Sequence, residues 1–187
     1  HSDHRRQRQM CIRDRLDGVA NKEMVMPEFQ REYVLSKDNA KQLLVSLYKS
    51  YPTGCLLFWE TNDPPEIKND AVARERIGLT KVILDGQQRL TTLYLIMKGA
   101  IPPYYTEDDL VNDPRNLYFN ILTGDFQYYA KAKMEGNPLW QNVTDCFDST
   151  KIDGYDIAER YCETNEEVDF RETMKVINNN LNQLRNI

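Results

Sequence analysis

Residues 82–97 read VILDGQQRLTTLYLIM, and this stretch decides the fold. Its first residues, Val82 to Leu84, are a short apolar run typical of a buried strand, and Asp85-Gly86 follows at once as a tight turn. The remainder predicts a helix through Lys98 that buries one apolar stripe. That stripe consists of Leu90, Leu93, Tyr94 and Met97.

The start of this helix carries groups that suit an anion. Backbone N–H groups and the helix dipole favour negative charge there, and Gly86 lets a ligand approach the backbone closely. Gln88, Arg89 and Thr92 fall on one arc that avoids the apolar stripe. With Asp85 as a ligand for a divalent cation, the set suits a nucleotide phosphate. The alternative is structural: Asp85 caps the helix, the glutamines are solvated and Arg89 pairs with a neighbouring acid.

The glycines exclude the two most familiar phosphate-binding loops. No two of the eight glycines lie closer together than Gly78 and Gly86. Neither G-x-G-x-x-G nor the Walker A pattern is therefore present, and any phosphate binding must use another scheme.

A second segment of interest is MPEFQREYV, residues 26–34. Residues 24–26 predict a strand that enters a loop at Pro27, and Gln30 and Arg31 follow on that loop. Loops often present a planar donor such as arginine to a ligand. The alternative is a plain surface arginine beside a buried Phe29.

The rest of the chain predicts an α+β fold, a small mixed sheet flanked by helices. Ser36 is expected to cap an amphipathic helix that Pro52 and Gly54 end. Residues 55–59 predict a buried strand, 60–79 a long loop, and 117–122 with 126–129 a hairpin. From about residue 137 the pattern turns helical and continues to the last residues without a C-cap, which indicates an incomplete helical segment. The expected core is Leu44, Leu47, Leu56, Phe58, Val82, Leu84, Leu90, Leu93, Tyr94, Phe119 and Ile121.

The first residues do not belong to this pattern. Residues 5–15, RRQRQMCIRDR, resemble the in-frame translation of a transposase-type sequencing adapter, so we interpret residues 1–15 as a scar. The predicted organisation is then a scar (1–15), one α+β domain (16–136) and the start of a helical region (137–187). Removing the scar's five arginines and two aspartates from 24 basic and 29 acidic side chains leaves a net charge of −8.

Composition and residue counts narrow the function. Hydrophobic residues make up 41% and charged residues 28%, and no apolar run approaches the length of a membrane span, so we expect a cytoplasmic protein with no membrane contact. The acidic balance argues against a free-standing DNA-binding domain. Both histidines lie in the scar, so the remainder excludes a His-dependent triad, a His–metal site and an HNH-type nuclease centre.

The order of these segments resembles the N-terminal domain of GmrSD-type restriction proteins, a family of prokaryotic phage-defence systems. The resemblance is carried by MPEFQREYV, by YPTGCLLFWE at residues 51–60 and by DGQQRLT at residues 85–91, and it covers about Leu16 to Tyr129. Such domains are similar to the ParB/sulfiredoxin fold, in which a motif at the start of a helix binds and hydrolyses a nucleoside triphosphate. This chain departs from those relatives at Gln88, where their motifs carry a histidine before the arginine.

The resemblance implies a site and a role. The implied site places Asp85, Gln88 and Arg89 in catalysis, with Asp85 also holding Mg²⁺. The implied nucleotide-binding residues are Gln30, Arg31, Gly86, Gln87, Gln88 and Arg89, and the helical arc described above adds Thr92. The implied function is an NTP-binding and NTP-hydrolysing regulatory domain of a modification-dependent restriction protein, which acts on modified DNA with a separate C-terminal HNH-type nuclease domain. The alternative is a non-catalytic module that senses modified DNA or docks the nuclease.

Overall fold

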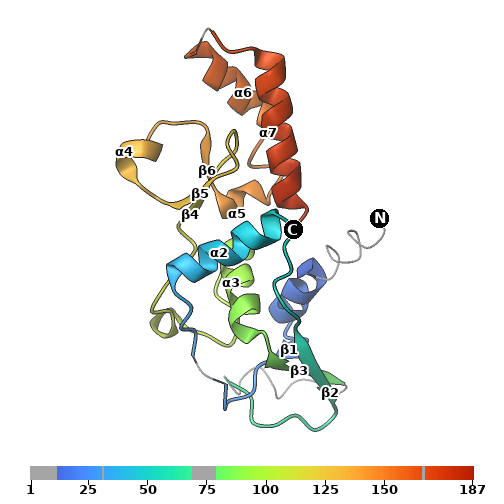
Figure 1. Cartoon of the computed structure of the whole chain (residues 1–187). Helices are drawn as coiled ribbons and strands as arrows, with labels where there is room; N and C mark the ends of the chain where they lie inside the picture. The colour runs from blue at the N-terminus through green and yellow to red at the C-terminus, as the bar shows by residue number, and fades with distance from the viewer. Residues whose placement is uncertain (1–11, 31, 69–78, 166) are drawn as a thin grey trace. The chain divides into compact units, whose positions relative to one another are not determined.

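The computed structural model describes residues 12–30, 32–68, 79–165 and 167–187 (Figure 1). It divides into two compact units between Asp113 and Pro114. The predicted α+β class is confirmed, because the described chain contains helices and two small three-stranded sheets. No helix among the described residues is long and apolar enough to cross a membrane.

The first unit is built on a mixed sheet in the order β1-β3-β2. Its central strand β3 (Thr80–Asp85) is parallel to β1 (Met24–Val25) and antiparallel to β2 (Leu57–Thr61). Val82 and Ile83 on β3 are fully buried although they point to opposite faces, so the middle of the sheet is covered on both sides. This is the small mixed sheet that the sequence predicts.

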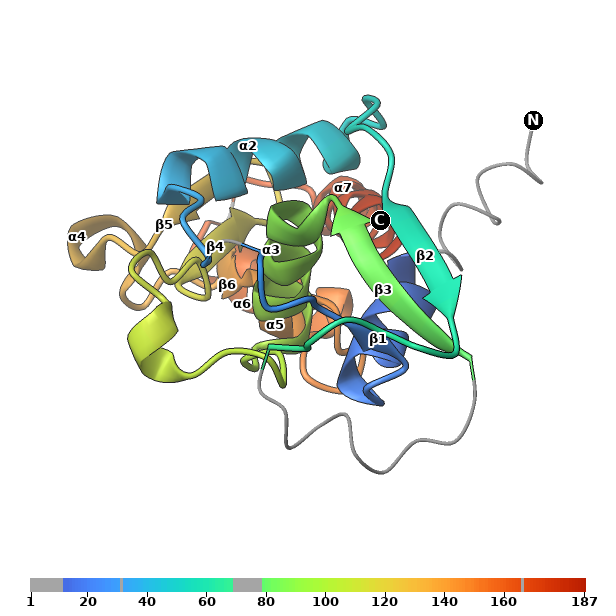
Figure 2. The same cartoon turned by 90° about the horizontal axis from the view of Figure 1, so that it is seen from below.

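Helix α3 (Gln87–Lys98) begins directly after β3, as predicted, and the two run into one another in Figure 2. It packs against α2 (Lys37–Tyr48), whose first turn is capped by the Ser36 hydroxyl accepting from the Asn39 N–H at 3.2 Å. The predicted apolar stripe of α3 is buried. The helix is also buried on other sides, because Leu95, Ile96 and three polar side chains are covered as well.

Residues 12–20 form a helix that packs on the sheet. Leu16 and Val19 are buried, and the Arg15 guanidinium lies 4.4 Å from the centre of the Phe58 ring. Residues 12–15, which the sequence assigns to the scar, thus form the first turn of this helix.

The prediction of a buried strand at residues 55–59 was wrong in two respects. The strand begins at Leu57, and it lies at the edge of the sheet with Leu57 and Trp59 exposed by 56% and 45%. An apolar run does not reveal whether the sheet continues beyond it. Most of the expected core is buried, but Leu47, Leu56 and Phe58 are half-buried and Leu84 is exposed.

The second unit contains the predicted hairpin. Strands β4 (Leu117–Asn120) and β5 (Phe126–Tyr128) pair in antiparallel fashion, and β6 (Trp140–Asn142) pairs with the other side of β4. Strand β6 lies beyond residue 137 and pairs with β4, so both strands belong to one unit. The boundary between the units is at Asp113–Pro114, whereas the sequence predicts one at residue 137. The helices of this unit are α4 (Lys131–Met134), α5 (Val143–Cys146), α6 (Gly154–Glu163) and α7 (Phe170–Arg185).

Candidate functional site

The junction between β3 and α3 is a turn that requires glycine. Gly86 has φ +86°, and a Cβ placed there would lie 2.2 Å from Cδ2 of Leu56 and 3.1 Å from Nη2 of Arg89. Gly86 is the N-cap of α3, and no side chain of the described residues caps the helix. The dipole of α3 favours negative charge at this end of the helix. Beside it, the side chain of Asp85 is 72% exposed.

Arg89 fastens the 51–55 segment (YPTGC) to the first turn of α3. Its Nη1 donates to the carbonyl of Thr53 and its Nη2 to the carbonyl of Cys55, and Nη2 also lies 3.4 Å from the Asp85 carboxylate. Between the two carbonyls, Gly54 has φ +89°, and a Cβ there would lie 2.3 Å from Nη1. Two of the three segments that carried the resemblance thus meet at one guanidinium.

Gln88 hydrogen-bonds to the remaining segment of the resemblance, residues 26–34. Its Nε2 donates to the Glu32 carbonyl at 2.9 Å, and its Oε1 accepts from the Val34 N–H at 3.0 Å. Gln30, on the same segment, donates from Nε2 to the Leu84 carbonyl at 3.1 Å. Arg31 lies outside the described residues. The alternative interpretation of this segment required a buried Phe29, but Phe29 is 73% exposed.

Gln87 and Thr92 lie in the interior of the unit. Gln87 is 4% exposed and donates from Nε2 to the Tyr105 hydroxyl at 2.7 Å. The Thr92 hydroxyl is fully buried, donates to the Gln88 carbonyl at 2.7 Å and lies 3.0 Å from the Tyr33 hydroxyl. Thr92 therefore does not share an exposed arc with Arg89. The spacing of polar residues did not reveal this, because the segments that cover α3 come from distant parts of the chain.

The two tyrosines of this interior network make the unit sensitive to alkali. Burial raises the pKa of the Tyr33 and Tyr105 hydroxyls above the ordinary value. A pKa raised by folding gives stability that is complete below the unfolded value near pH 10 and is lost as pH rises through the folded pKa. We expect the urea midpoint to hold steady up to about pH 10 and to fall above it, and Tyr33→Phe to make that fall shallower. A midpoint that is flat into strong alkali would contradict the burial of these hydroxyls.

One further side chain near this network was not found from the sequence. The Lys68 ammonium lies 4.6 Å from the centre of the Tyr105 ring. Within the part of the chain that the structure describes, its buried Nζ has no hydrogen-bond partner. An attraction between the ammonium and the ring partly offsets the loss of water. A lone lysine in a charged loop gives no signal of this in the sequence.

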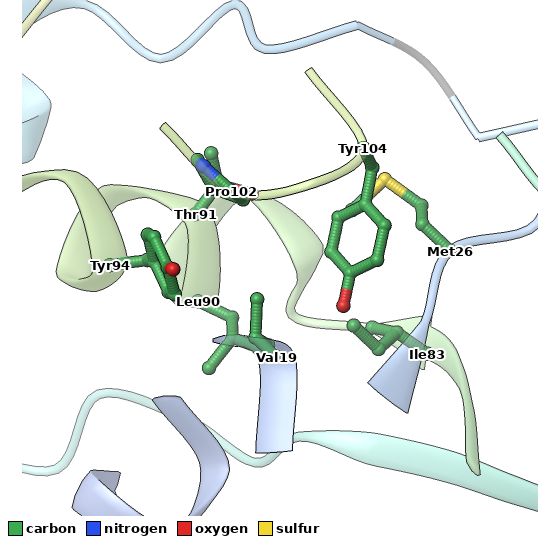
Figure 3. A pocket seen from close by; sticks show the side chains of 8 residues that line it. All are labelled: Val19, Met26, Ile83, Leu90, Thr91, Tyr94, Pro102 and Tyr104. Atoms are coloured by element: carbon green, nitrogen blue, oxygen red, sulfur yellow. The ribbon is translucent and has the colours of Figure 1, made fainter. Parts of the chain in front are cut away.

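An apolar gap lies under α3, lined by side chains that include Val19, Ile83 and Leu90 (Figure 3). It is too narrow to admit a water-sized sphere, so it is part of the packed core and not a ligand site. Of the candidate site residues, Asp85 is exposed at the β3–α3 junction. Among the described residues there is no cluster of three or more side chains that would hold a metal by themselves.

Comparison with known proteins agrees with the resemblance drawn from the motifs. The sequence matches the family described as GmrSD restriction endonuclease, N-terminal domain, over residues 12–187. It is also 31% identical to an uncharacterized protein of Methanocaldococcus jannaschii, over 58% of this chain and 22% of that protein. The chain thus spans about a fifth of the length of that relative. No solved structure matches.

Proposed function

The chain belongs to the GmrSD restriction endonuclease N-terminal domain family, and from this premise we propose that it binds and hydrolyses a nucleoside triphosphate at the β3–α3 junction. In this proposal the domain has a ParB/sulfiredoxin-like fold and regulates a longer, modification-dependent restriction protein. The other partners are modified DNA and a C-terminal HNH-type nuclease domain.

The observation that carries the proposal is the convergence of three features at the β3–α3 junction, of which the Asp85 carboxylate is exposed. The start of α3, the Asp85 carboxylate and the Arg89 guanidinium meet there. The space beside Gly86 is filled by Leu56 and by Arg89 itself, so a ligand reaches the backbone only when Arg89 moves. Backbone N–H groups at a helix start bind phosphate oxygens, and a guanidinium adds a fixed positive charge. A triphosphate is an anion that uses all of these donors at once.

The roles of the remaining residues follow from their contacts. Gln88 holds residues 32–34 against the junction. Gln30, which is bonded to the Leu84 carbonyl, and Arg31 are the further nucleotide ligands in this proposal. Gln87 and Thr92 support the first turns of α3 from the interior. With no histidine in the motif, the attacking water would lose its proton to a carboxylate or to solvent. Its oxygen bonds to the terminal phosphorus as the bridging P–O bond breaks, and the nucleoside diphosphate leaves with the electron pair.

Asp85 fits Mg²⁺ held jointly with the nucleotide. Mg²⁺ is usually bound by one or two carboxylates together with phosphate oxygens and water, so a single exposed carboxylate beside a phosphate site is sufficient. The bound ion would neutralise charge on the transferred phosphoryl group. Asp85 would hold it in place there.

The direct test measures binding and phosphate release separately. The four common NTPs are titrated with Mg²⁺ against the 187-residue chain, and phosphate release is then followed at saturation. We expect saturable binding of at least one NTP and release of phosphate above the rate without protein. If no NTP binds, the proposal fails.

Replacing Asp85 tests the Mg²⁺ assignment. Asp85→Asn keeps the side-chain shape, so the melting temperature should change little, while Mg²⁺-dependent NTP affinity should fall by about tenfold. Glu60→Gln is the matched control, because Glu60 is an exposed carboxylate paired with Lys81 at 3.7 Å on the same sheet. Equal affinities for Asp85→Asn and wild type in the presence of Mg²⁺ would remove Asp85 from the metal site.

The exposed apolar side chains near the junction favour the alternative role. Phe29 is 73% exposed and Leu57 and Trp59 lie on the sheet edge, a composition typical of contact surfaces. In this alternative the domain senses modified DNA or docks the nuclease without catalysis. Tight NTP binding without any phosphate release favours the alternative.

A further inference from the structure

The terminal nitrogens of Arg89 are already occupied. Nη1 and Nη2 donate to the carbonyls of Thr53 and Cys55, and the side chain is only 25% exposed. A guanidinium binds a phosphate in bidentate fashion through two N–H groups on one edge. In this structure the edge formed by Nη1 and Nη2 faces the backbone of the 51–55 segment instead.

We propose that Arg89 is an exchangeable clasp: it holds the 51–55 segment when the site is empty and releases it to bind a nucleotide phosphate. This inference rests on the proposed function, because the competing ligand is the triphosphate. A carbonyl is a neutral acceptor and a phosphate oxygen is charged, and hydrogen bonds between two charged groups are the stronger ones. The phosphate therefore wins the exchange once it reaches the start of α3.

Two glycines shape the clasp. The Cβ positions of Gly54 and Gly86 lie 2.3 Å and 3.1 Å from Nη1 and Nη2 of Arg89, so the guanidinium occupies the space that side chains would fill. Both glycines have positive φ, which other residues adopt only with strain. The closed clasp thus depends on glycine at both positions.

When Arg89 releases the 51–55 segment, the edge strand β2, which follows this segment, is also affected. Within the described chain, the two bonds from Arg89 tie residues 53–55 to α3. The segment leads into β2, whose ladder with β3 already has a register shift between Leu57 and Phe58. Nucleotide binding is thereby transmitted to an edge strand that exposes Leu57 and Trp59. The state of the nucleotide site would control that surface.

The first test compares affinities. If the carbonyls compete with phosphate for Arg89, a variant that opens the clasp must bind the triphosphate more tightly. Gly54→Ala places a Cβ against Nη1 and should raise Mg²⁺–triphosphate affinity by about fivefold or more, the lower range for coupled sites. Gly136→Ala is the matched control, since Gly136 also has positive φ but its Cβ would meet nothing within 4 Å. A folded Gly54→Ala variant with unchanged or weaker affinity overturns the clasp.

The second test uses wild-type protein and does not depend on how Gly54→Ala folds. Cys55 is exposed and lies in the clasped segment, so amide hydrogen exchange of residues 53–57 and alkylation of Cys55 are followed by mass spectrometry. Saturating inorganic tripolyphosphate or NTP should speed the exchange of these amides by about fivefold or more, as should Arg89→Ala without ligand. Lys98→Ala, which removes a surface ion pair with Asp17 at the other end of α3, should leave it unchanged.

The outcomes separate the two proposals. Saturable binding without faster exchange in residues 53–57 overturns the clasp and leaves the proposed function standing. Failure of every NTP and of tripolyphosphate to bind overturns both. Faster exchange across the whole unit, rather than in this segment, indicates general unfolding and also counts against the clasp.

Discussion

Arg89→Ala is expected to lower triphosphate affinity by about tenfold or more and to lower the free energy of unfolding by about 2–3 kcal/mol. The first effect follows from loss of the charged donor at the start of α3. The second follows from loss of both bonds to the Thr53 and Cys55 carbonyls. From the sequence alone Arg89 resembles a surface arginine, whose removal costs about 0.5 kcal/mol or less. The two hydrogen bonds in the structure raise the expected loss of stability above that value.

Arg89→Lys should recover only part of either effect, since a single ammonium cannot reproduce the planar fork that reaches two carbonyls. Urea unfolding and nucleotide titration are measured on wild type, both variants and Lys98→Ala. Lys98 is an exposed cation on the same helix, paired with Asp17 at 2.6 Å, so its removal should cost less than about 1 kcal/mol. If Arg89→Ala lowers the free energy of unfolding no more than Lys98→Ala does, the bonds from Arg89 to the 51–55 segment do not stabilise the unit.

The strand, turn and helix at residues 80–98 were predictable because their signals are local. An apolar run, a glycine where the chain must turn and an apolar stripe at helical spacing all occur within twenty residues. Ser36 was predictable for the same reason, because an N-cap is set by a side chain and the backbone three residues on. The hairpin around residue 124 follows the same rule.

The contacts of the motif were not predictable from spacing. Arg89 binds backbone carbonyls, and every residue has a carbonyl, so no residue type in the sequence announces the partner. Helical spacing placed Thr92 with Gln88 and Arg89 on an arc that avoids the apolar stripe. The burial of Thr92 depends on Tyr33, which is 59 residues away. Exposure of Leu57 and Trp59 depends likewise on which strand neighbours β2, and this is a property of the sheet.

The position of the DGQQR motif at a strand-to-helix junction was predictable, but the contacts of its individual residues were not. The resemblance assigned Gln87, Gln88 and Arg89 to the nucleotide as a group. In the structure Gln87 points to Tyr105 in the interior, Gln88 clips the 32–34 backbone, and Arg89 bridges to the 51–55 segment. Consecutive helical residues point about 100° apart, so one motif reaches three different parts of the unit.

Gly86→Ala should lower the free energy of unfolding by about 2–4 kcal/mol and abolish measurable triphosphate binding at the concentrations that saturate wild type. Alanine at φ +86° is strained, and its Cβ would lie 2.2 Å from Leu56 and 3.1 Å from Arg89. The new methyl group would also displace the Arg89 guanidinium, which binds the phosphate in the proposed function. Urea unfolding and nucleotide titration measure the two effects on the same preparations.

Gly136→Ala separates strain from crowding. Gly136 has φ +73° with open space around its Cβ position, so this variant shows the strain of positive φ alone, about 1–2 kcal/mol. The additional loss of unfolding free energy in Gly86→Ala then measures the steric clash of the new Cβ with Leu56 and Arg89. If both variants lose the same stability and Gly86→Ala still binds triphosphate normally, the ligand does not approach the backbone at Gly86. The candidate site would then have to lie elsewhere in the unit.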